Sequence, residues 1–449
     1  MPEKKKVIII GCGVAGISAA IELIQAGFDV EIFESKNFPG GRVYSVFDGI
    51  ANEEHDNGQH LLSGAYFHFF EILKVLGTDN LVKRQQNLRV VFSYSNGEKD
   101  ILDGSPFKGK IGLLAGLLKL KKISLKSKYH ITTFFSKLLF NKLEYDDKTV
   151  RELLIMNHQT GEAIQRFWEP LALATLNSSI DSAPAELLIE VLNKAFFADK
   201  EASTLIFPNV GLSSLLAPFT HWFSEKGGKI HFGQSIKKLM IKDDKVEAIE
   251  TKSGDIYYAD YFISTVQPNS LLKIISNSET DTAKFNYLKN FDFSTIISIY
   301  LWLDRELKGI DFSAMIGTKT QWLFNRREIL NEFSNTNKNF KGHIALTISS
   351  GDDLSKEDSE KLADFCFDEV KNCFPELKGA KILHKKVIKD KFATVRLTQK
   401  NLKFRPKAET HLKNFFLAGD WIDTNLPATI EGAALSGRNA IRDIKSYFP

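Results

Sequence analysis

Near the start of the chain, the apolar residues form a short continuous run, Val7–Ile10, that ends at glycines. Such a run is typical of a buried parallel strand that ends in a sharp turn. Ile17–Ala26 then carries apolar residues at helical spacing, and Val30–Phe33 is a second short apolar run. Strand, helix and strand in this order predict a βαβ unit with a parallel sheet.

Further along, the hydrophobic pattern predicts a helical region from about Asp56 to residue 200 and a helix over Leu212–Glu225. Strands follow at 229–232, 235–241, 246–251, 256–258 and 261–265. From about residue 293, the pattern predicts strands at 295–303, 322–325 and 344–349 and a helix at 356–373. The fold class expected is α/β, with a discontinuous Rossmann-type domain and an inserted α+β substrate domain. The predicted boundaries are 1–66, 203–272 and 400–449 for the first domain, and 67–202 and 273–399 for the second.

The glycines after the first strand form a G-x-G-x-x-G motif, and they let the backbone turn tightly and approach a pyrophosphate. We expect this contact at Gly11, Gly13, Val14, Ala15 and Gly16. Glu34 ends the second strand, at the distance where an acid accepts hydrogen bonds from the adenosine ribose. A lone motif of this kind also fits an ordinary tight turn, but the complete order of elements favours a dinucleotide site.

Two further motifs indicate that this dinucleotide is FAD. Gly40-Gly41-Arg42 resembles a motif of flavoproteins in the amine oxidase and phytoene desaturase superfamily. This resemblance implies that Gly41 and Arg42 lie near the pyrophosphate or the flavin, where arginine offers a planar, permanent charge. The C-terminal segment resembles the second flavin motif of that superfamily, which implies cofactor contacts from Gly419, Asp420, Ala428, Thr429 and Ile430. In related flavoproteins the segment matching Ile236 lies against the adenine.

Composition narrows the class of protein without identifying its function. A chain of 449 residues, 43% of them hydrophobic, is long enough to bury a large core. Its three cysteines are too scattered for a disulfide framework or a metal cluster, so we expect no metal site and a reducing cytoplasm. The N-terminus imitates a signal peptide, but cleavage there would destroy the dinucleotide turn.

Charge is distributed unevenly along the chain. Residues 104–143 contain nine lysines and no Asp or Glu, although the net charge of the whole chain is only +4. These lysines alternate with apolar runs, a pattern that suits a helix lying in an anionic bilayer surface. We therefore expect 104–143 to contact the inner face of the cytoplasmic membrane; the alternative is ordinary amphipathic helices packed on the protein. Nucleic acid is not expected as a partner, because the segment is rich in leucine and phenylalanine.

A second set of motifs resembles the hydroxysqualene dehydroxylase family, flavoproteins of bacterial squalene biosynthesis. These motifs are Asp56-Asn57-Gly58-Gln59-His60, Trp168-Glu169-Pro170-Leu171, Gln321–Phe324 and Leu426–Gly432. The resemblance extends over most of the chain and is weakest at 104–143 and 275–315. Asn425 departs from it, because glycine is more usual at this position. The resemblance implies reductive removal of an allylic hydroxyl, which converts hydroxysqualene to squalene in hopanoid or carotenoid biosynthesis with reduced FAD as the hydride source.

This reaction needs an acid near the hydroxyl, so that water leaves. We expect His60 or Asp56 to supply or relay the proton, and Gln59 to order the local network. The alternative is that Asp56–His60 only braces the flavin through hydrogen bonds.

Other functions fit the same scaffold. An oxidative phytoene-type desaturase would move hydride in the opposite direction, and a non-catalytic flavoprotein could serve as a scaffold for membrane enzymes. An amine oxidase is less favoured, because no aromatic cage for an amine can be identified in the sequence. The substrate expected is an isoprenoid, and no second nicotinamide motif identifies the electron donor of FAD.

Overall fold

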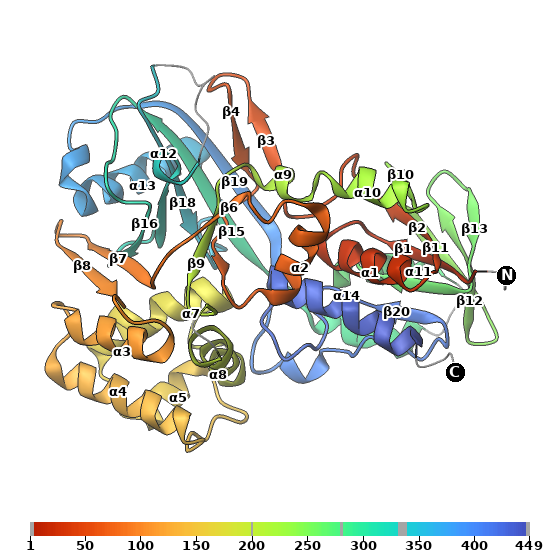
Figure 1. Cartoon of the computed structure of the whole chain (residues 1–449), viewed down its shortest axis with the longest axis horizontal. Helices are drawn as coiled ribbons and strands as arrows, with labels where there is room; N and C mark the ends of the chain where they lie inside the picture. Colours follow the sequence, from red (N-terminus) through yellow and green to blue (C-terminus); the bar gives the residue numbers. More distant parts are fainter. Residues whose placement is uncertain (1–3, 199–200, 279–281, 331–338, 446–449) are drawn as a thin grey trace.

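The computed structural model describes residues 4–198, 201–278, 282–330 and 339–445. The predicted domain limits at residues 1 and 449 lie outside these ranges. Figure 1 shows an elongated molecule, with both ends of the described chain in its right-hand part. In the described ranges, no helix is long and apolar enough to cross a membrane.

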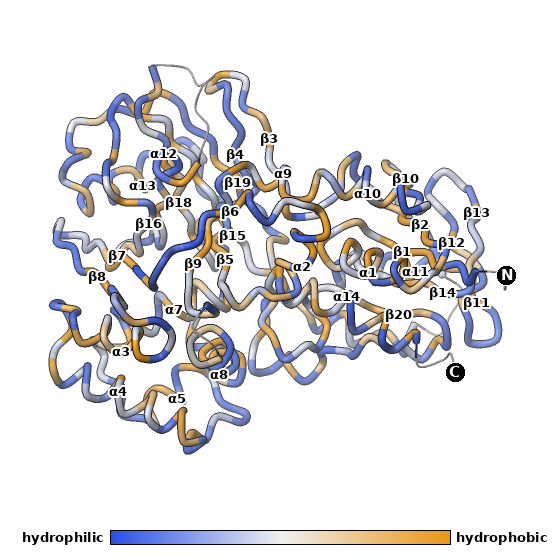
Figure 2. The backbone as a smooth tube through the Cα atoms, in the orientation of Figure 1, coloured by the Kyte–Doolittle hydropathy of each residue, from blue (hydrophilic) through white to orange (hydrophobic). Residues whose placement is uncertain are grey.

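A parallel five-stranded sheet forms the core of the right-hand part. Its strands run in the order β10 (Lys229–Phe232), β2 (Asp29–Glu34), β1 (Lys6–Ile10), β14 (Tyr261–Ser264) and β20 (Phe415–Leu417). The helices α1 (Val14–Gln25) and α14 (Ile430–Lys445) lie side by side next to it. Figure 2 shows hydrophobic residues along β1 and α1, as burial on both sides of a parallel sheet requires. The predicted Rossmann-type fold is confirmed.

Smaller elements extend this part of the molecule. A three-stranded antiparallel sheet contains β11 (Ile236–Lys242), β12 (Lys245–Thr251) and β13 (Ile256–Tyr258). The helix α11 (Pro268–Ser276) packs beside β11, and α10 (Phe219–Glu225) lies near β10. The helix predicted over 212–225 is in fact two helices, α9 (Leu212–Leu216) and α10. Pro218 separates them, because proline lacks the amide that a continuous helix needs.

A mixed seven-stranded sheet forms the second part, at the upper left of Figure 1. Its strands, in spatial order, are β19 (Ile382–Arg396), β15 (Asp292–Leu303), β18 (Gly342–Ile348), β17 (Trp322–Asn325), β16 (Phe312–Ile316), β7 (Arg89–Tyr94) and β8 (Lys99–Asp103). The helix α13 (Ser359–Cys373) packs on one face against alternate residues of β15, such as Ile299 and Leu301. The hairpin of β3 (Ser45–Asp48) and β4 (Glu53–Asp56), together with α12 (Arg326–Ile329), packs with the opposite face.

Helices form the third part, at the lower left of Figure 1. They are α3 (Gly109–Lys119), α4 (Leu125–Leu139), α5 (Val150–Met156), α6 (Gly161–Ala163), α7 (Glu169–Leu176) and α8 (Ala185–Leu192), with π-helical turns at Ile164–Trp168 and Asn193–Phe197. Trp168 is fully buried here, between Phe134 and Phe135, and its indole N–H donates to Gln159 Oε1 at 2.8 Å.

The predicted helical region from about Asp56 to residue 200 is wrong for its first part, because the chain between Asp56 and about residue 104 is not mainly helical. It contains β5 (Leu62–Ser63), α2 (Phe67–Leu76), β6 (Val82–Arg84), β7 and β8. β9 (Leu205–Pro208) joins β5 and β6 in a small sheet, and β7 joins β16 of the mixed sheet. β5, β6 and one edge of β7 pair with residues more than a hundred positions away, so local periodicity does not reveal these pairings. β7 and β8 form a local antiparallel hairpin. The remaining 3₁₀ segments are Thr282–Asn290, Pro375–Leu377 and Leu402–Phe404.

Candidate functional site

The first strand-to-helix turn has the backbone that an anion site needs. Gly11 has a φ of 106°, a conformation that favours glycine, and a Cβ at Gly16 would lie 2.1 Å from the Gly11 carbonyl oxygen. Gly13 precedes α1 without capping it by a side chain, and the first turn of α1, which begins at Val14 and Ala15, carries no acid. The amides and the positive end of the helix dipole are therefore available to a phosphate.

Beside this turn lies a cavity that fits the adenosine half of a dinucleotide. Its volume is about 670 Å³, and Gly11, Glu34 and Ile236 all contribute to its lining. Glu34 is buried, and its carboxylate accepts hydrogen bonds from the amides of Cys12 at 2.7 Å and Lys36 at 2.8 Å. The structure thus brings together three residues that the sequence analysis assigned to the same nucleotide.

The Gly40-Gly41 turn lies directly against the glycine turn. The Gly40 amide donates to the Cys12 carbonyl at 2.8 Å, and a Cβ at Gly41 would lie 3.0 Å from the Gly13 Cα. Because Gly13 and Gly41 have no side chains, the two backbone segments lie in contact beside the place where a pyrophosphate would bind. This close approach places Arg42 next to the phosphate-binding turn.

Arg42 joins the two ends of the chain. Its guanidinium lies 2.8 Å from Asp420 Oδ2 and donates to the Ala393 carbonyl at 2.8 Å. Burial opposes the charge, but the Asp420 carboxylate outweighs it and raises the pKa of Arg42. Asp420 Oδ1 is buried and has no hydrogen-bond partner among the described residues. An acceptor left open in this way fits a hydroxyl of the ribityl chain.

The other predicted C-terminal contacts lie around the start of α14. Thr429 Oγ1 accepts a hydrogen bond from the Gly432 amide at 3.2 Å, and Ala428, Thr429 and Ile430 are partly exposed. Gly419 has a φ of 141° and donates its amide to Ser436 of α14. Asn425 has a φ of 60°, in the left-handed region, which explains physically why glycine is usual there and why asparagine is tolerated.

Asp56 is held in a buried ion pair. It is 1% exposed, and its carboxylate accepts from Ser45 Oγ, the Leu212 amide and Arg326 Nη1 at 2.7–2.9 Å. Arg326 is also 1% exposed and donates to Gln59 Oε1 at 2.8 Å. Asp56 and Gln59 therefore share one cation, which fixes the loop that carries His60.

His60 is placed differently from Asp56. Its Nδ1 lies 2.7 Å from the Gly58 carbonyl oxygen, which can only accept, so Nδ1 carries the proton and Nε2 holds a lone pair. Burial, together with the nearby charge of Arg42, lowers the pKa of His60 below its ordinary value near 6.5. The ring is thus neutral at pH 7.

Three residues of this region were not predicted. Arg326 follows β17 as the counterion of Asp56, and Asp390 of β19 accepts a hydrogen bond from Asn57 at 3.3 Å. Arg405 is buried and donates to the carbonyls of the flavin-motif loop, at Asp420, Trp421, Ile422 and Leu426. None of these three residues belongs to a motif. Only Arg326 could have been noticed in the sequence, because it is a basic residue directly after an apolar strand.

The residues present fit FAD. The cavity beside Glu34 suits the adenosine, the open helix N-terminus beside the Gly40-Gly41 turn suits the pyrophosphate, and the unpartnered Asp420 oxygen suits the ribityl chain. In the described part of the chain, no group of His, Cys, Asp or Glu is arranged to hold a metal ion.

Comparison with known proteins agrees with this arrangement. Hydroxysqualene dehydroxylase of Rhodopseudomonas palustris is 27% identical over 441 residues, 97% of each chain. Zeta-carotene desaturase of Zea mays is 24% identical over 480 residues, covering 97% of this chain and 82% of the relative.

Solved structures share the fold. An oxidoreductase from Methanosarcina mazei superposes with a TM-score of 0.74 at 17% identity, covering 97% of this chain and all of the other. Putrescine oxidase bound to putrescine gives 0.73 at 13% identity, with 99% of both chains covered. The family profile described as flavin containing amine oxidoreductase matches residues 14–445. Because the match runs from the phosphate-binding helix to the last helix, this chain belongs to the flavin containing amine oxidoreductases and is an FAD-dependent oxidoreductase.

Proposed function

We propose that this enzyme reductively dehydroxylates hydroxysqualene to squalene. The observation that carries the proposal is the similarity to hydroxysqualene dehydroxylases along the whole length, including the parts outside the flavin motifs.

In this reaction a C–O bond breaks, a C–H bond forms, and the hydroxyl leaves with a proton as water. When bound, reduced FAD supplies the hydride, and an external two-electron reductant must restore it. The residues around α1 and Arg42 hold the pyrophosphate, Glu34 accepts from the ribose, and Asp420 Oδ1 accepts from the ribityl chain.

We propose that His60 donates the proton from Nε2, while Asp56 and Gln59 hold its loop through Arg326. Because burial keeps His60 neutral at pH 7, it must first be protonated. The rate of dehydroxylation should therefore rise as the pH falls below 7 toward the lowered pKa of His60.

The test is an anaerobic single turnover of photoreduced holoenzyme with hydroxysqualene in detergent, following flavin oxidation and extracted squalene between pH 5.5 and 8. We expect squalene in proportion to oxidised flavin. His60→Asn should retain FAD but lose most of the rate and its pH dependence, whereas the exposed control His221→Gln should behave as wild type. No squalene from wild-type enzyme would disprove the function, and full turnover by His60→Asn would remove only the assignment of the acid.

A second candidate is oxidative desaturation of an isoprenoid. It is supported by the similarity to zeta-carotene desaturases and by the lone pair on the neutral His60, which suits a base better than an acid. A polyene should then bleach the oxidised flavin. The sign of the pH dependence would be opposite, with the rate rising as pH increases through the pKa of His60.

We further propose that 104–143 contacts an anionic membrane on the cytoplasmic side, with α3 and α4 forming the contact. Exposed apolar side chains lie along these helices, including Ile111, Leu118, Leu125 and Tyr129, and α3 and α4 lie at the end of the molecule far from the five-stranded sheet (Figure 1). Five of the nine lysines bond to the protein itself: Lys108, Lys119, Lys122, Lys128 and Lys137.

Lys110, Lys121, Lys126 and Lys142 form no ion pair with the described residues and are exposed. Lys142 lies over the ring of Phe140. These four lysines are therefore the ones available to pair with anionic lipid headgroups.

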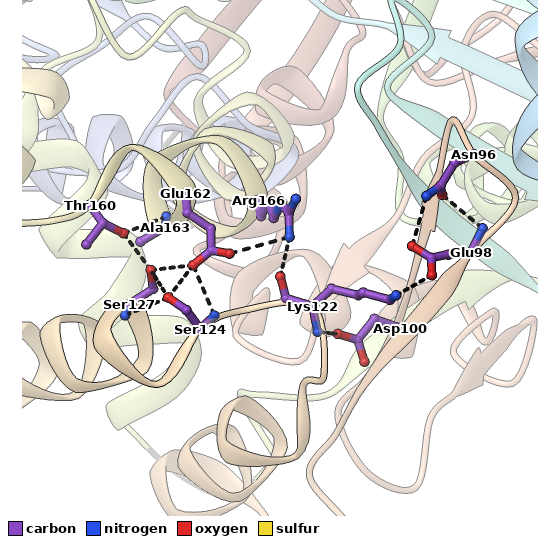
Figure 3. Close-up of polar contacts among 10 residues, drawn as sticks. All are labelled: Asn96, Glu98, Asp100, Lys122, Ser124, Ser127, Thr160, Glu162, Ala163 and Arg166. Carbon is purple, nitrogen blue, oxygen red and sulfur yellow. Dashed lines mark hydrogen bonds and ion pairs between the residues drawn. The ribbon is translucent and has the colours of Figure 1, made fainter.

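Polar contacts hold the two helices in place (Figure 3). Glu162 accepts hydrogen bonds from the Ser124 amide, Ser124 Oγ and Ser127 Oγ, at 2.5–3.0 Å. Arg166 donates to the Lys122 carbonyl, and the Lys122 amide donates to Asp100 at 2.7 Å. Because the segment between α3 and α4 is held at Lys122 and Ser124, the apolar surface is already formed before it meets a membrane.

Sedimentation with vesicles containing phosphatidylserine tests this contact. Wild-type holoenzyme should bind and be released by salt, and Lys121→Glu/Lys126→Glu should bind about thirtyfold more weakly or worse, since each of the two lysines contributes roughly 1 kcal/mol. Leu383→Ser, at an exposed leucine of β19, is the control and should bind as wild type. Unchanged binding of the double variant would contradict the proposal.

A further inference from the structure

Two hydroxyl side chains stand next to each other on the aromatic face of the mixed sheet. Ser298 of β15 pairs directly with Thr347 of β18, and Thr347 pairs directly with Trp322 of β17. Directly opposed residues in antiparallel strands project to the same face. Ser298, Thr347 and Trp322 therefore form one row across three strands.

The next row on this face is apolar and aromatic. It contains Tyr300, Ala345 and Phe324, at the positions two residues along the same strands. Thr347 Oγ1 is buried without a hydrogen-bond partner among the described residues, so it is not bonded to the neighbouring Ser298 or to Tyr300 of the next row. A buried hydroxyl without a partner is costly, so Thr347 Oγ1 is open to a hydrogen bond with a ligand.

The loop that carries His60 lies over this row. A Cβ at Gly58 would come within 3.3 Å of Ser298 Oγ, so glycine lets the loop backbone approach the hydroxyl closely. The Gly58 carbonyl in turn orients the His60 ring. Ser298 and the imidazole are therefore held by the same turn of chain.

A second pair of hydroxyl side chains in this sheet needs no hydrogen-bond partner from outside the protein. Ser93 and Ser313 are fully buried and bond to each other at 2.9 Å. Ser313 lies in a row with Leu323, Leu346 and Ile299, which face α13. Thr347 Oγ1 shares its lack of a partner with polar atoms of Tyr300, Trp302 and His343 on the same face. The serine pair on the α13 face is satisfied, so the unpartnered hydroxyl at Thr347 belongs to the face beneath His60.

We propose that Ser298 and Thr347 form the subsite for the hydroxyl group of an allylic alcohol. This inference rests on the proposed dehydroxylase function. Thr347 donates to the substrate oxygen, and Ser298 bonds to the same oxygen from the neighbouring strand. The subsite holds the alcohol beside the loop of His60 and discriminates it from the hydrocarbon product, which cannot make these bonds.

The test compares the binding of hydroxysqualene and squalene to oxidised holoenzyme, by the change in flavin absorbance in detergent. Thr347→Val keeps the shape of the side chain and removes the hydroxyl, so affinity for hydroxysqualene should fall about tenfold while affinity for squalene stays the same. Ser298→Ala should act in the same direction. Thr347→Ser restores a hydroxyl and should recover the preference for the alcohol.

The control is Ser313→Ala, which removes a hydroxyl from the opposite face and should leave the ratio of the two affinities unchanged. If wild-type enzyme forms squalene but Thr347→Val keeps the wild-type ratio, the subsite is disproved and the dehydroxylase function stands. If wild-type enzyme neither prefers nor converts the alcohol, both fail together. Equal weakening of alcohol and hydrocarbon would also disprove the subsite, because it would indicate a loss of packing.

Discussion

At the scale of single residues, the buried pair of Asp56 and Arg326 is the main determinant of the loop before His60. Both side chains are 1% exposed and 2.9 Å apart. Arg326 also donates to the Glu54 carbonyl and to Gln59. One guanidinium thus connects the β3–β4 hairpin, the His60 loop and the mixed sheet.

Removing one member of this pair should be far more harmful than removing both. Arg326→Met leaves the Asp56 carboxylate buried without its cation, and we expect a loss of about 3–5 kcal/mol in the free energy of unfolding. Asp56→Asn combined with Arg326→Met should recover a large part of that loss. Denaturant unfolding of the four proteins of this double-mutant cycle measures it. Strictly additive losses would show that the pair is not coupled.

His343 is a second buried titratable side chain, and it contacts the carboxylate of Glu53. Its ring stacks on Trp302 at 4.4 Å between centroids, and its Nδ1 donates to Glu53 at 2.8 Å. Burial lowers the pKa of His343 to about 3. The folded protein therefore keeps His343 neutral, whereas the unfolded chain protonates it below about 6.5.

Acid should consequently destabilise the fold through His343. The unfolded state binds a proton at His343 that the folded state does not bind. The contribution of His343 to stability is therefore complete above pH 6.5 and is lost as the pH falls toward 3, by up to about 1.4 kcal/mol per pH unit. His343→Asn keeps an amide donor for Glu53 but cannot take up a proton. Urea unfolding at pH 7, 6 and 5 should show a smaller decline for this variant, and an equal decline would contradict the assignment.

At the scale of elements, the cofactor site depends on the close packing of α1 and α14. A Cβ at Gly437 of α14 would lie 2.4 Å from the Ala15 carbonyl oxygen and 2.8 Å from Ser18 Cβ. Ser18 Oγ also donates to the Ala434 carbonyl at 2.7 Å. The two helices, from opposite ends of the chain, are therefore held in backbone contact next to the phosphate-binding turn.

Gly437→Ala should force these helices apart. We expect a loss of about 1–3 kcal/mol in stability from overpacking, together with weaker FAD binding, because Ala15 belongs to the first turn of α1. Flavin fluorescence titration and thermal unfolding of the holoenzyme measure both effects. Gly161→Ala, where no atom would lie within 4 Å of the new Cβ, is the matched control. Wild-type FAD affinity in Gly437→Ala would show that the helix contact does not shape the site.

At the scale of the whole molecule, Asn177 connects the helical part to the mixed sheet. It ends α7 with a φ of 49°, and its carbonyl accepts from Ser294 and Ser350 at 3.2 and 3.1 Å. Its side-chain oxygen accepts from Ser349 at 3.0 Å. One serine of β15 and two serines directly after β18 thus converge on one residue of the helical part.

Two substitutions separate the side chain of Asn177 from its backbone. Asn177→Gly tolerates the positive φ and removes only the bond to Ser349, so we expect a loss of about 0.5–1.5 kcal/mol. Asn177→Val opposes the backbone conformation itself and should weaken all three contacts. Hydrogen exchange should accelerate at the end of α7 and at residues 349–350 in the valine variant well beyond the glycine variant. Equal exchange in the two would contradict this role.

Sequence and structure agree best where the physical demand is local. The glycine turn, β1, β2 and Glu34 follow from backbone conformation and from spacing over some thirty residues, so the sequence alone predicts them. The short strands β5 and β6 and the long strand β19 pair with distant segments, so their pattern carries little local signal. The split at Pro218 could have been predicted from proline chemistry, but the apolar spacing concealed it.

By itself, the sequence determined the chemistry of the nucleotide site: a glycine turn before a helix, an acid after the next strand, and two flavin motifs at the ends of the chain. Only the tertiary structure decided which residues meet across the chain: Arg42 with Asp420, Asp56 with Arg326, and Ser298 with Thr347. It also decided that most lysines of 104–143 bond to the protein and only a few remain available to a partner. The physical reason is that burial and pairing depend on the packing of distant segments, whereas turns and helix starts depend on neighbouring residues.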